Sequence, residues 1–431
     1  MKKFLVTLLF FSPLAGMCQQ DILNRFGQKV KDRAMQRTEE GMDKAIDKAE
    51  DEVKKEGTAA KKKTDKKETA VEARPSQKKD AGFESYSHYD FIPGETMVYA
   101  EDFSQDVVGE FPLKWSTNNQ GQTVTIREQP GQWLRLMKDG HFVSPYIKGA
   151  GNFTLEFDAV LHLPENVDNT SYADLVIRLM NVPPNDDKAR QFFNNSFDSR
   201  ADIRFTLQPY TDEHTTINLE STSGGNNSGY FRSENKELPK FASCLAKPIH
   251  FAVWVQKERF RLWINGEKVY DLPQAVPDKI LFNRFEFQTG SSSYDVGYYV
   301  SNIRLAEGTP DMRSKLITEG KLVTTGILFD INSDKIKPES SGVLQEIARN
   351  LKENNGVKVM IIGHTDNDGN DAGNLDLSKR RAAAVKTALH AQYGIDENRM
   401  QTDGKGARQP VADNNTKEGK AKNRRVEFIK L

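Results

Sequence analysis

Residues 363–385 read GHTDNDGNDAGNLDLSKRRAAAV, an acidic loop followed by three consecutive basic residues and an alanine-rich run. The residues just before it, VKVMII, predict a buried strand, and residues 374–393 predict a helix. Asp366 therefore lies at the carboxyl end of a strand, the edge at which open α/β layers usually bind ligands. The stretch predicts an α/β layer with a ligand site at its strand-to-helix junction.

Arg381 is the basic residue that we expect to face Asp366. Leu377, Arg381 and Val385 are spaced by four residues, so they share one face of the predicted helix. A carboxylate binds an ammonium group, and a guanidinium binds a carboxylate through two hydrogen bonds. Asp366 and Arg381 together suit a zwitterionic amino-acid ligand, and the plain alternative is an ordinary salt bridge.

The acidic loop also has the alternate spacing of a calcium loop, with Asp366, Asp368 and Asn370. An EF-hand needs glycine at its sixth position and glutamate at its twelfth. Here those positions hold Asp371 and Leu377, which argues against that type of site. The seven histidines are scattered without ligand-like spacing. The sequence therefore predicts no metal site and no cofactor.

Residues 324–431 alternate between strand-like and helix-like patterns. Six segments carry these patterns: a strand in 321–330, a helix in 338–354, a strand in 357–366, a helix in 374–393, a strand or turn in 400–406 and a final strand in 423–431. Their order predicts an α/β unit of the type β-α-β-α-β-β, with right-handed parallel crossovers.

The motifs GHTDNDG, NLDLSKRRA and NRRVEF resemble the signature of the OmpA-like C-terminal peptidoglycan-binding domain, which peptidoglycan-associated lipoproteins and flagellar stator proteins share. The stretch ILFDINSDKIKPES is similar to that family's first strand and helix start. The resemblance implies that Asp366 and Arg381 hold the diaminopimelate residue of the peptidoglycan stem peptide. Further candidates at the same site are Thr365, Asn374, Leu377 and Arg425.

Residues 91–308 contain many short strand-like runs separated by Gly, Pro and Asn, which indicates an antiparallel β-sandwich. Asn265 and Gly266 predict a tight hairpin turn. The stretches EDFSQDVVGEFPLKW, FRLWINGEKVYDLP and GYYVSNIRLA resemble concanavalin-A-like (laminin-G-like) jelly rolls. Residues 210–231, which contain aromatic, Asn and Asp side chains, leave carbohydrate binding open.

Glu156 and Asp158 are the two residues that raise the question of an enzyme. Glucanases of this fold place two carboxylates two residues apart on one strand face, with a further acid beyond them. Here Val160 and Leu161 follow, so the third carboxylate is missing. We therefore expect a non-enzyme in which Glu156 and Asp158 lie on a solvated strand face, with a carbohydrate-active enzyme as the alternative.

The N-terminal residues predict export. Residues 1–18 have two lysines and then an apolar run, typical of a signal peptide. Cys18 is either removed with it or lipidated, and Cys244 is the only other cysteine. Residues 19–56 predict a charged amphipathic helix, residues 57–90 a disordered lysine-rich linker and residues 309–323 a second linker.

The expected function is that of an exported, non-enzymatic cell-envelope protein. Lysine plus arginine and aspartate plus glutamate both number 61, which argues against a nucleic-acid partner. The expected partners are peptidoglycan for residues 324–431 and a glycan or protein for the β-sandwich. The family ligand implies a Gram-negative periplasm, with outer-membrane association if Cys18 is lipidated.

Overall fold

The computed structural model describes residues 89–149, 151–164, 172–183, 193, 200–224, 229–308 and 311–431. All of them fall within one structural unit, Glu84–Leu431. The predicted signal peptide with Cys18, the charged helix in 19–56 and almost all of the linker in 57–90 lie outside the described residues. None of the helices in the described part of the chain is long and apolar enough to cross a membrane.

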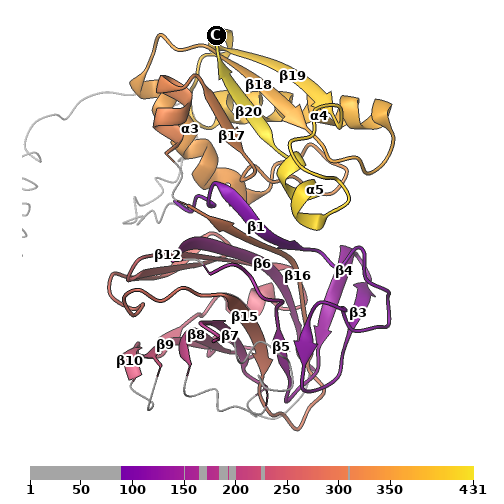
Figure 1. The fold of residues 1–431 in the computed structure, drawn as a ribbon, viewed down its shortest axis with the longest axis vertical. Helices are drawn as coiled ribbons and strands as arrows, with labels where there is room; N and C mark the ends of the chain where they lie inside the picture. The colour runs from indigo at the N-terminus through magenta and orange to yellow at the C-terminus, as the bar shows by residue number, and fades with distance from the viewer. Residues whose placement is uncertain are drawn as a thin grey trace, which may run out of the picture. The chain divides into compact units, whose positions relative to one another are not determined.

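Residues 96–307 form two antiparallel sheets, here called the two-sheet region (Figure 1). The first sheet runs in the order β14-β13-β12-β6-β16-β4-β3, and β1 pairs with β16. Its strands are β1 (Thr96–Glu101), β3 (Gly121–Ile126), β4 (Gln129–Leu136), β6 (Asn152–His162), β12 (Ile249–Gln256), β13 (Arg259–Ile264), β14 (Glu267–Leu272) and β16 (Gly297–Glu307).

The second sheet runs in the order β10-β9-β8-β7-β15-β5-β2, and β11 pairs with β9. Its strands are β2 (Ser116–Thr117), β5 (His141–Val143), β7 (Leu175–Met180), β8 (Ala201–Gln208), β9 (Thr216–Ser223), β10 (Gly229–Arg232), β11 (Lys236–Glu237) and β15 (Arg284–Thr289). A short helix, η4 (Phe241–Cys244), belongs to the same region.

One hydrophobic core lies between these two sheets, because alternate residues of each strand point inward. Phe157 of β6 stacks on Phe251 of β12 with ring centroids 4.9 Å apart, and Phe287 of β15 meets Phe157 edge-on at 5.0 Å. Asn265 and Gly266 turn between β13 and β14 with positive φ, as the hairpin prediction requires. The region is antiparallel β-structure as predicted, and its resemblance to jelly rolls stays a prediction.

Glu156 and Asp158 are buried, so the prediction that they lie on a solvated face is wrong. They are 4% and 6% exposed, respectively. Oδ1 of Asp158 lies 2.7 Å from Nδ1 of His250, and Oδ2 accepts a hydrogen bond from Asn302 at 2.8 Å. Nζ of Lys337, which is far along the chain, lies 4.0 Å from Asp158. Residues distant in sequence therefore cover this face of β6.

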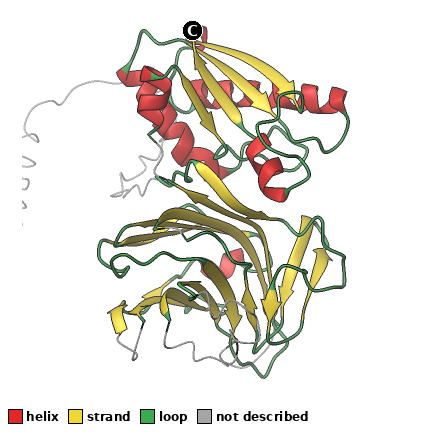
Figure 2. Ribbon diagram, in the orientation of Figure 1, coloured by secondary structure: helices red, strands yellow, loops and turns green. Residues whose placement is uncertain are grey.

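Residues 321–430 form the C-terminal region, in which most of the helices of Figure 2 gather around a four-stranded sheet. The sheet has the order β17-β20-β18-β19, and only β18 and β19 are parallel. Its strands are β17 (Lys321–Thr324), β18 (Val359–His364), β19 (Met400–Gly406) and β20 (Val426–Lys430). The helices here and just before are η5 (Ser314–Thr318), η6 (Pro338–Ser340), α3 (Ser341–Glu353), α4 (Asp371–Ala391), η7 (Glu397–Arg399) and α5 (Lys417–Asn423).

The helix α5 departs from the predicted β-α-β-α-β-β order. Its sequence, KEGKAKN, contains Ala421 as its one apolar residue, so no apolar periodicity marks it as a helix. The side chain of Thr416 accepts a hydrogen bond from the backbone N–H of Gly419, which is the cap that begins the helix.

Glycines let α4 approach the sheet closely and so fix its position. A Cβ atom at Gly363 of β18 would lie 2.2 Å from the carbonyl oxygen of Ser378 in α4. At Gly404 of β19 a Cβ atom would lie 2.4 Å from the backbone nitrogen of Lys379. Side chains at these two positions would push the helix away. The strand-to-helix junction at Asp366 is therefore held by backbone packing.

Candidate ligand-binding site at the end of β18

Asp366 lies two residues beyond the end of β18 and is 7% exposed. Its Oδ1 accepts a hydrogen bond from the backbone N–H of Asp368 at 3.2 Å. Its Oδ2 forms an ion pair of 2.5 Å with Nη1 of Arg424. The sheet edge therefore presents a carboxylate that is held in place by its own loop and by one arginine.

Arg381 lies on α4 and is held by backbone oxygens of the segment between β17 and η6. Its Nε donates a hydrogen bond to the carbonyl of Ser333 at 2.9 Å, and its Nη2 donates to that of Asp330 at 3.4 Å. Its Cζ lies 4.8 Å from the ring centroid of Phe329, which is cation–π distance. These partners orient the guanidinium without neutralising it.

The two charges interact electrostatically. Burial lowers the pKa of Arg381, the negative charge of Asp366 acts in the opposite direction, and the positive charge of Arg424 adds to the lowering. Arg381 is therefore a partly desolvated cation that a further anion would stabilise.

Asn374 shapes the loop that carries Asp366. It is 8% exposed, and its Nδ2 donates to the carbonyl of Asp368 at 2.9 Å and to that of Asp366 at 3.4 Å. The side chain of Asn370 caps α4 by accepting a hydrogen bond from Gly373 N. Leu377 is half-buried, one turn before Arg381 on the same helix. Asn374 acts here through the backbone of the loop.

Thr365 and Arg425 are placed differently from the other predicted residues. The hydroxyl of Thr365 is buried and, within the described part of the chain, has no hydrogen-bond partner. Arg425 is 5% exposed and donates from Nε to Glu427 at 2.8 Å and from Nη2 to the carbonyl of Gln409 at 3.1 Å. The arginine that reaches Asp366 is its neighbour, Arg424, which is not among the predicted site residues.

Basic side chains from α5 and its end border the acidic loop. Nζ of Lys420 lies 2.7 Å from Oδ1 of Asp368, in addition to the pair between Arg424 and Asp366. Behind the loop, burial and the charge of Arg425 lower the pKa of His364 to about 4, although Glu427 acts in the opposite direction. Among the residues that the structure describes, no cluster of His, Cys, Asp and Glu has the arrangement of a metal site.

A family model of the OmpA family matches residues 328–424. Outer membrane protein A of Bordetella avium is 43% identical over 100 residues, which are 23% of this chain and 51% of that protein. The putative lipoprotein YfiB of Escherichia coli is 36% identical over 107 residues, which are 25% of this chain and 67% of that protein. Through residues 328–424, the chain belongs to the OmpA family.

The crystal structure of the peptidoglycan-associated lipoprotein from Burkholderia pseudomallei has 30% sequence identity, covers 24% of this chain and 88% of its own, and has a TM-score of 0.23. The matched part of this chain spans about half of the Bordetella relative, 51% of its length. The OmpA-like domain, meaning the C-terminal region from here on, contains every residue of the candidate site.

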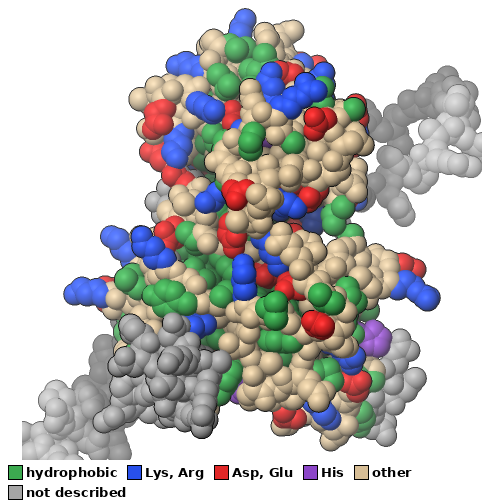
Figure 3. All heavy atoms as spheres, turned by 45° about the vertical axis from the view of Figure 1, so that its right-hand side comes forward, with side chains coloured by type: hydrophobic (Ala, Val, Ile, Leu, Met, Phe, Trp, Pro, Cys, Tyr) green, Lys and Arg blue, Asp and Glu red, His purple; other side chains and the backbone are tan. Residues whose placement is uncertain are grey.

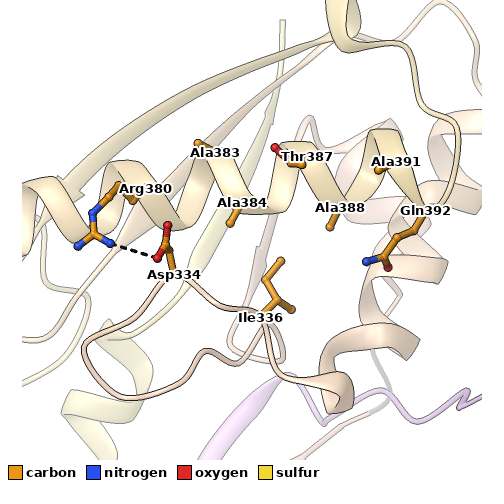
Figure 4. A pocket seen from close by; sticks show the side chains of 9 residues that line it. All are labelled: Asp334, Ile336, Arg380, Ala383, Ala384, Thr387, Ala388, Ala391 and Gln392. Atoms are coloured by element: carbon orange, nitrogen blue, oxygen red, sulfur yellow. Dashed lines mark hydrogen bonds and ion pairs between the residues drawn. The ribbon is translucent and has the colours of Figure 1, made fainter.

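The OmpA-like domain also has an open groove of about 510 Å³ on the side of α4 next to Arg380 (Figure 4). Alanines of α4 line one wall, and Ile336 faces them from the segment before η6. Arg380 closes one end through its 3.1 Å ion pair with Asp334. On the face shown in Figure 3, basic and acidic side chains are interspersed.

Proposed function

We propose that the chain is a non-enzymatic cell-envelope protein that binds peptidoglycan non-covalently through the OmpA-like domain, at the diaminopimelate residue of the stem peptide. The side-chain end of diaminopimelate carries both an ammonium and a carboxylate. Asp366 would bind the ammonium, and Arg381 would bind the carboxylate. The observation that carries the proposal is the electrostatic interaction between the buried Asp366 carboxylate and the guanidinium of Arg381, which is held by carbonyl oxygens.

The setting of the two charges supports this assignment. Asp366 is buried and Arg381 is half-buried, so both act in surroundings of lower dielectric than bulk water. Hydrogen bonds between charged partners are roughly twice as strong as those between neutral ones, and the guanidinium geometry favours a planar carboxylate. Asn374 would keep the loop of Asp366 in the binding conformation.

The cellular place and the second partner belong to the same proposal. The names of the relatives, an outer membrane protein and a lipoprotein, support association with the outer membrane or periplasm. The two-sheet region would present a surface to a glycan or protein partner. The alternative of a carbohydrate-active enzyme is less favoured, because the carboxylates of Glu156 and Asp158 are buried against His250.

Co-sedimentation with purified diaminopimelate-type peptidoglycan tests the proposal. We expect Asp366→Asn and Arg381→Gln each to weaken binding at least tenfold, since losing one charged partner costs about 2–5 kcal/mol. Arg380→Gln is the matched control, because Arg380 is the neighbouring, exposed residue of α4 and pairs with Asp376 and Asp334. Wild-type binding by both folded site variants would refute the proposed site.

A further inference from the structure

The helix α5 of the OmpA-like domain is fastened to the two-sheet region. Nζ of Lys417, the first residue of α5, forms ion pairs with Glu101, at the end of β1, and with Asp106 at 2.9 Å. All three side chains are largely buried, with exposures of 12%, 4% and 17%. Burial acts to lower the pKa of Lys417, but its bonds to Glu101 and Asp106 outweigh this and raise it. The lysine therefore stays charged.

Apolar packing reinforces this attachment. Ala421, one turn after Lys417 on α5, forms a small buried cluster with Met97 and Ala100 of β1. Nζ of Lys417 also lies 5.9 Å from the ring centroid of Phe103. A buried ion pair is costly to break on one side, because the remaining charge is left uncompensated. The position of α5 thus depends on the two-sheet region.

Side chains at the end of α5 contact the candidate site. The backbone N–H of Arg424 donates to the carbonyl of Lys420, so Arg424 continues the last turn of the helix. Lys420 pairs with Asp368 at 2.7 Å, and Arg424 pairs with Asp366 at 2.5 Å. One short helix therefore joins β1 to the carboxylate that the proposed function assigns to the ligand.

The pair between Arg424 and Asp366 occupies the place of a ligand cation. The side chain of Arg424 is 42% exposed, so it can move away from the Asp366 carboxylate into solvent. Exposed ion pairs contribute little on their own. Arg424 has its backbone held at hydrogen-bonding reach of Asp366 from both sides, by the anchored helix α5 before it and by β20, which pairs with β18, after it.

We propose that Arg424 is an internal substitute for the ligand's ammonium, and that the two-sheet region holds it on Asp366 through Lys417 and α5. The inference rests on the proposed function, since it concerns regulation of the same site. The two-sheet region lowers the affinity of the site for a cationic ligand. A partner or wall contact that displaces β1 from α5 raises that affinity, because the binding-competent state becomes more populated.

Calorimetric titration of the full chain with meso-diaminopimelate tests the inference. Removing the competing cation should raise the competent fraction, so Arg424→Gln should tighten binding by about threefold to tenfold. Lys417→Met, made together with Glu101→Gln so that the more buried of its two carboxylate partners is not left charged without a cation, should tighten binding by roughly twofold to fivefold. The triple variant that also carries Arg424→Gln should bind no more tightly than Arg424→Gln alone, because all of these changes act on the contact between Arg424 and Asp366.

Three results would overturn the inference. Weaker binding by Arg424→Gln would show that Arg424 contacts the ligand itself. Unchanged binding after Lys417→Met with Glu101→Gln would show that the two-sheet region does not act on the site. Additive effects of the two sets of substitutions on affinity would show that they act on separate contacts. Lys422→Met is the control, because Lys422 lies on α5 and the structure shows no ion pair for it among the described residues.

Hydrogen exchange without ligand separates this inference from the proposed function. Loosening α5 through Lys417→Met with Glu101→Gln should speed exchange in residues 417–424 and in residues 366–374, and Lys422→Met should not. Unchanged exchange in residues 366–374 would contradict the coupling. A wild-type chain that fails to bind meso-diaminopimelate would instead refute the proposed function and the role of Arg424 as a substitute, whatever the exchange result.

Discussion

Nδ1 of His250 lies 2.7 Å from Oδ1 of Asp158, and Nε2 of the same ring lies 3.6 Å from Glu156. Burial alone would lower the pKa of His250, but its bond to Asp158 and the charge of Glu156 raise the pKa to about 10. The histidine is therefore a buried cation between two buried carboxylates. It links β12 to β6 on the face that residues of the OmpA-like domain help to cover.

His250→Gln should lower the free energy of unfolding by about 3–5 kcal/mol, because it removes the cation that lies between two buried carboxylates. Denaturant unfolding at pH 7 measures this change. His214→Gln is the control, because His214 is exposed and pairs with a single exposed carboxylate, Asp212. A loss below about 1 kcal/mol, the range of an exposed pair, would contradict the account.

The raised pKa of His250 predicts a loss of stability in alkaline solution. His250 has an ordinary pKa of 6.5 in the unfolded chain and about 10 in the folded protein. The folded state thus binds more protons between these values, so the stabilisation is complete below pH 6.5 and is lost as pH rises toward 10. The stability difference between wild type and His250→Gln should shrink over this range in denaturant titrations. A constant difference would show that His250 is neutral.

Gly363→Ala should destabilise the OmpA-like domain by about 1–3 kcal/mol or more, since the added methyl group would meet the Ser378 carbonyl. The displaced α4 should also carry Arg381 away from Asp366 and weaken peptidoglycan binding. Gly356→Ala is the matched control, because a Cβ atom there has no neighbour within 4 Å. Thermal unfolding and co-sedimentation measure both effects, and equal behaviour of the two variants would contradict the packing argument.

Asn374→Ala should weaken ligand binding roughly threefold to tenfold, since the loop loses hydrogen bonds worth about 1 kcal/mol each. Its amide donates to the carbonyls of Asp366 and Asp368. Titration with meso-diaminopimelate measures the change, with Asn367→Ala, an exposed residue of the same loop, as the control. A larger effect of the control would assign the contact to Asn367 instead.

The helix α3 and the strands β18 and β20 were predictable, because each carries its own apolar pattern, and α4 was predictable from its alanine-rich run. The helix α5 was not, because its stability comes from a cap at Thr416 and from contacts of Lys417 and Ala421 with β1. Sequence periodicity reports burial along a segment and gives no sign of a charged helix that is fixed by distant partners.

The sequence predicted only part of the candidate site, because it did not distinguish Arg424 from Arg425. The motif NRRV contains two adjacent arginines, and residues next to one another in an extended segment point to opposite sides. Arg425 points toward Glu427 and Arg424 toward Asp366. The alternation was a usable signal, but the choice between the two required the position of β20 beside β18.

The face of β6 illustrates the limit of a pattern of alternation. Phe153, Leu155 and Phe157 correctly mark the core side of the strand. The pattern also suggested that Glu156 and Asp158 face solvent, which holds only when nothing covers the second face. Here Tyr89, which precedes β6 in the sequence, and Lys337, which follows it, help to enclose these carboxylates.

If Asp366 binds the ammonium and Arg381 the carboxylate of one ligand end, two stem peptides that differ in that carboxylate should be distinguished by the site. A tripeptide ending in meso-diaminopimelate has both an ammonium and a carboxylate at the end of that side chain, whereas its lysine counterpart has an ammonium alone at that end. We expect wild type to prefer the diaminopimelate peptide by roughly tenfold or more, the value of a hydrogen bond to a charged group. Arg381→Gln should remove this preference and leave lysine-peptide affinity nearly unchanged. Equal affinity of wild type for the two peptides, or an equal loss for both in Arg381→Gln, would contradict the account.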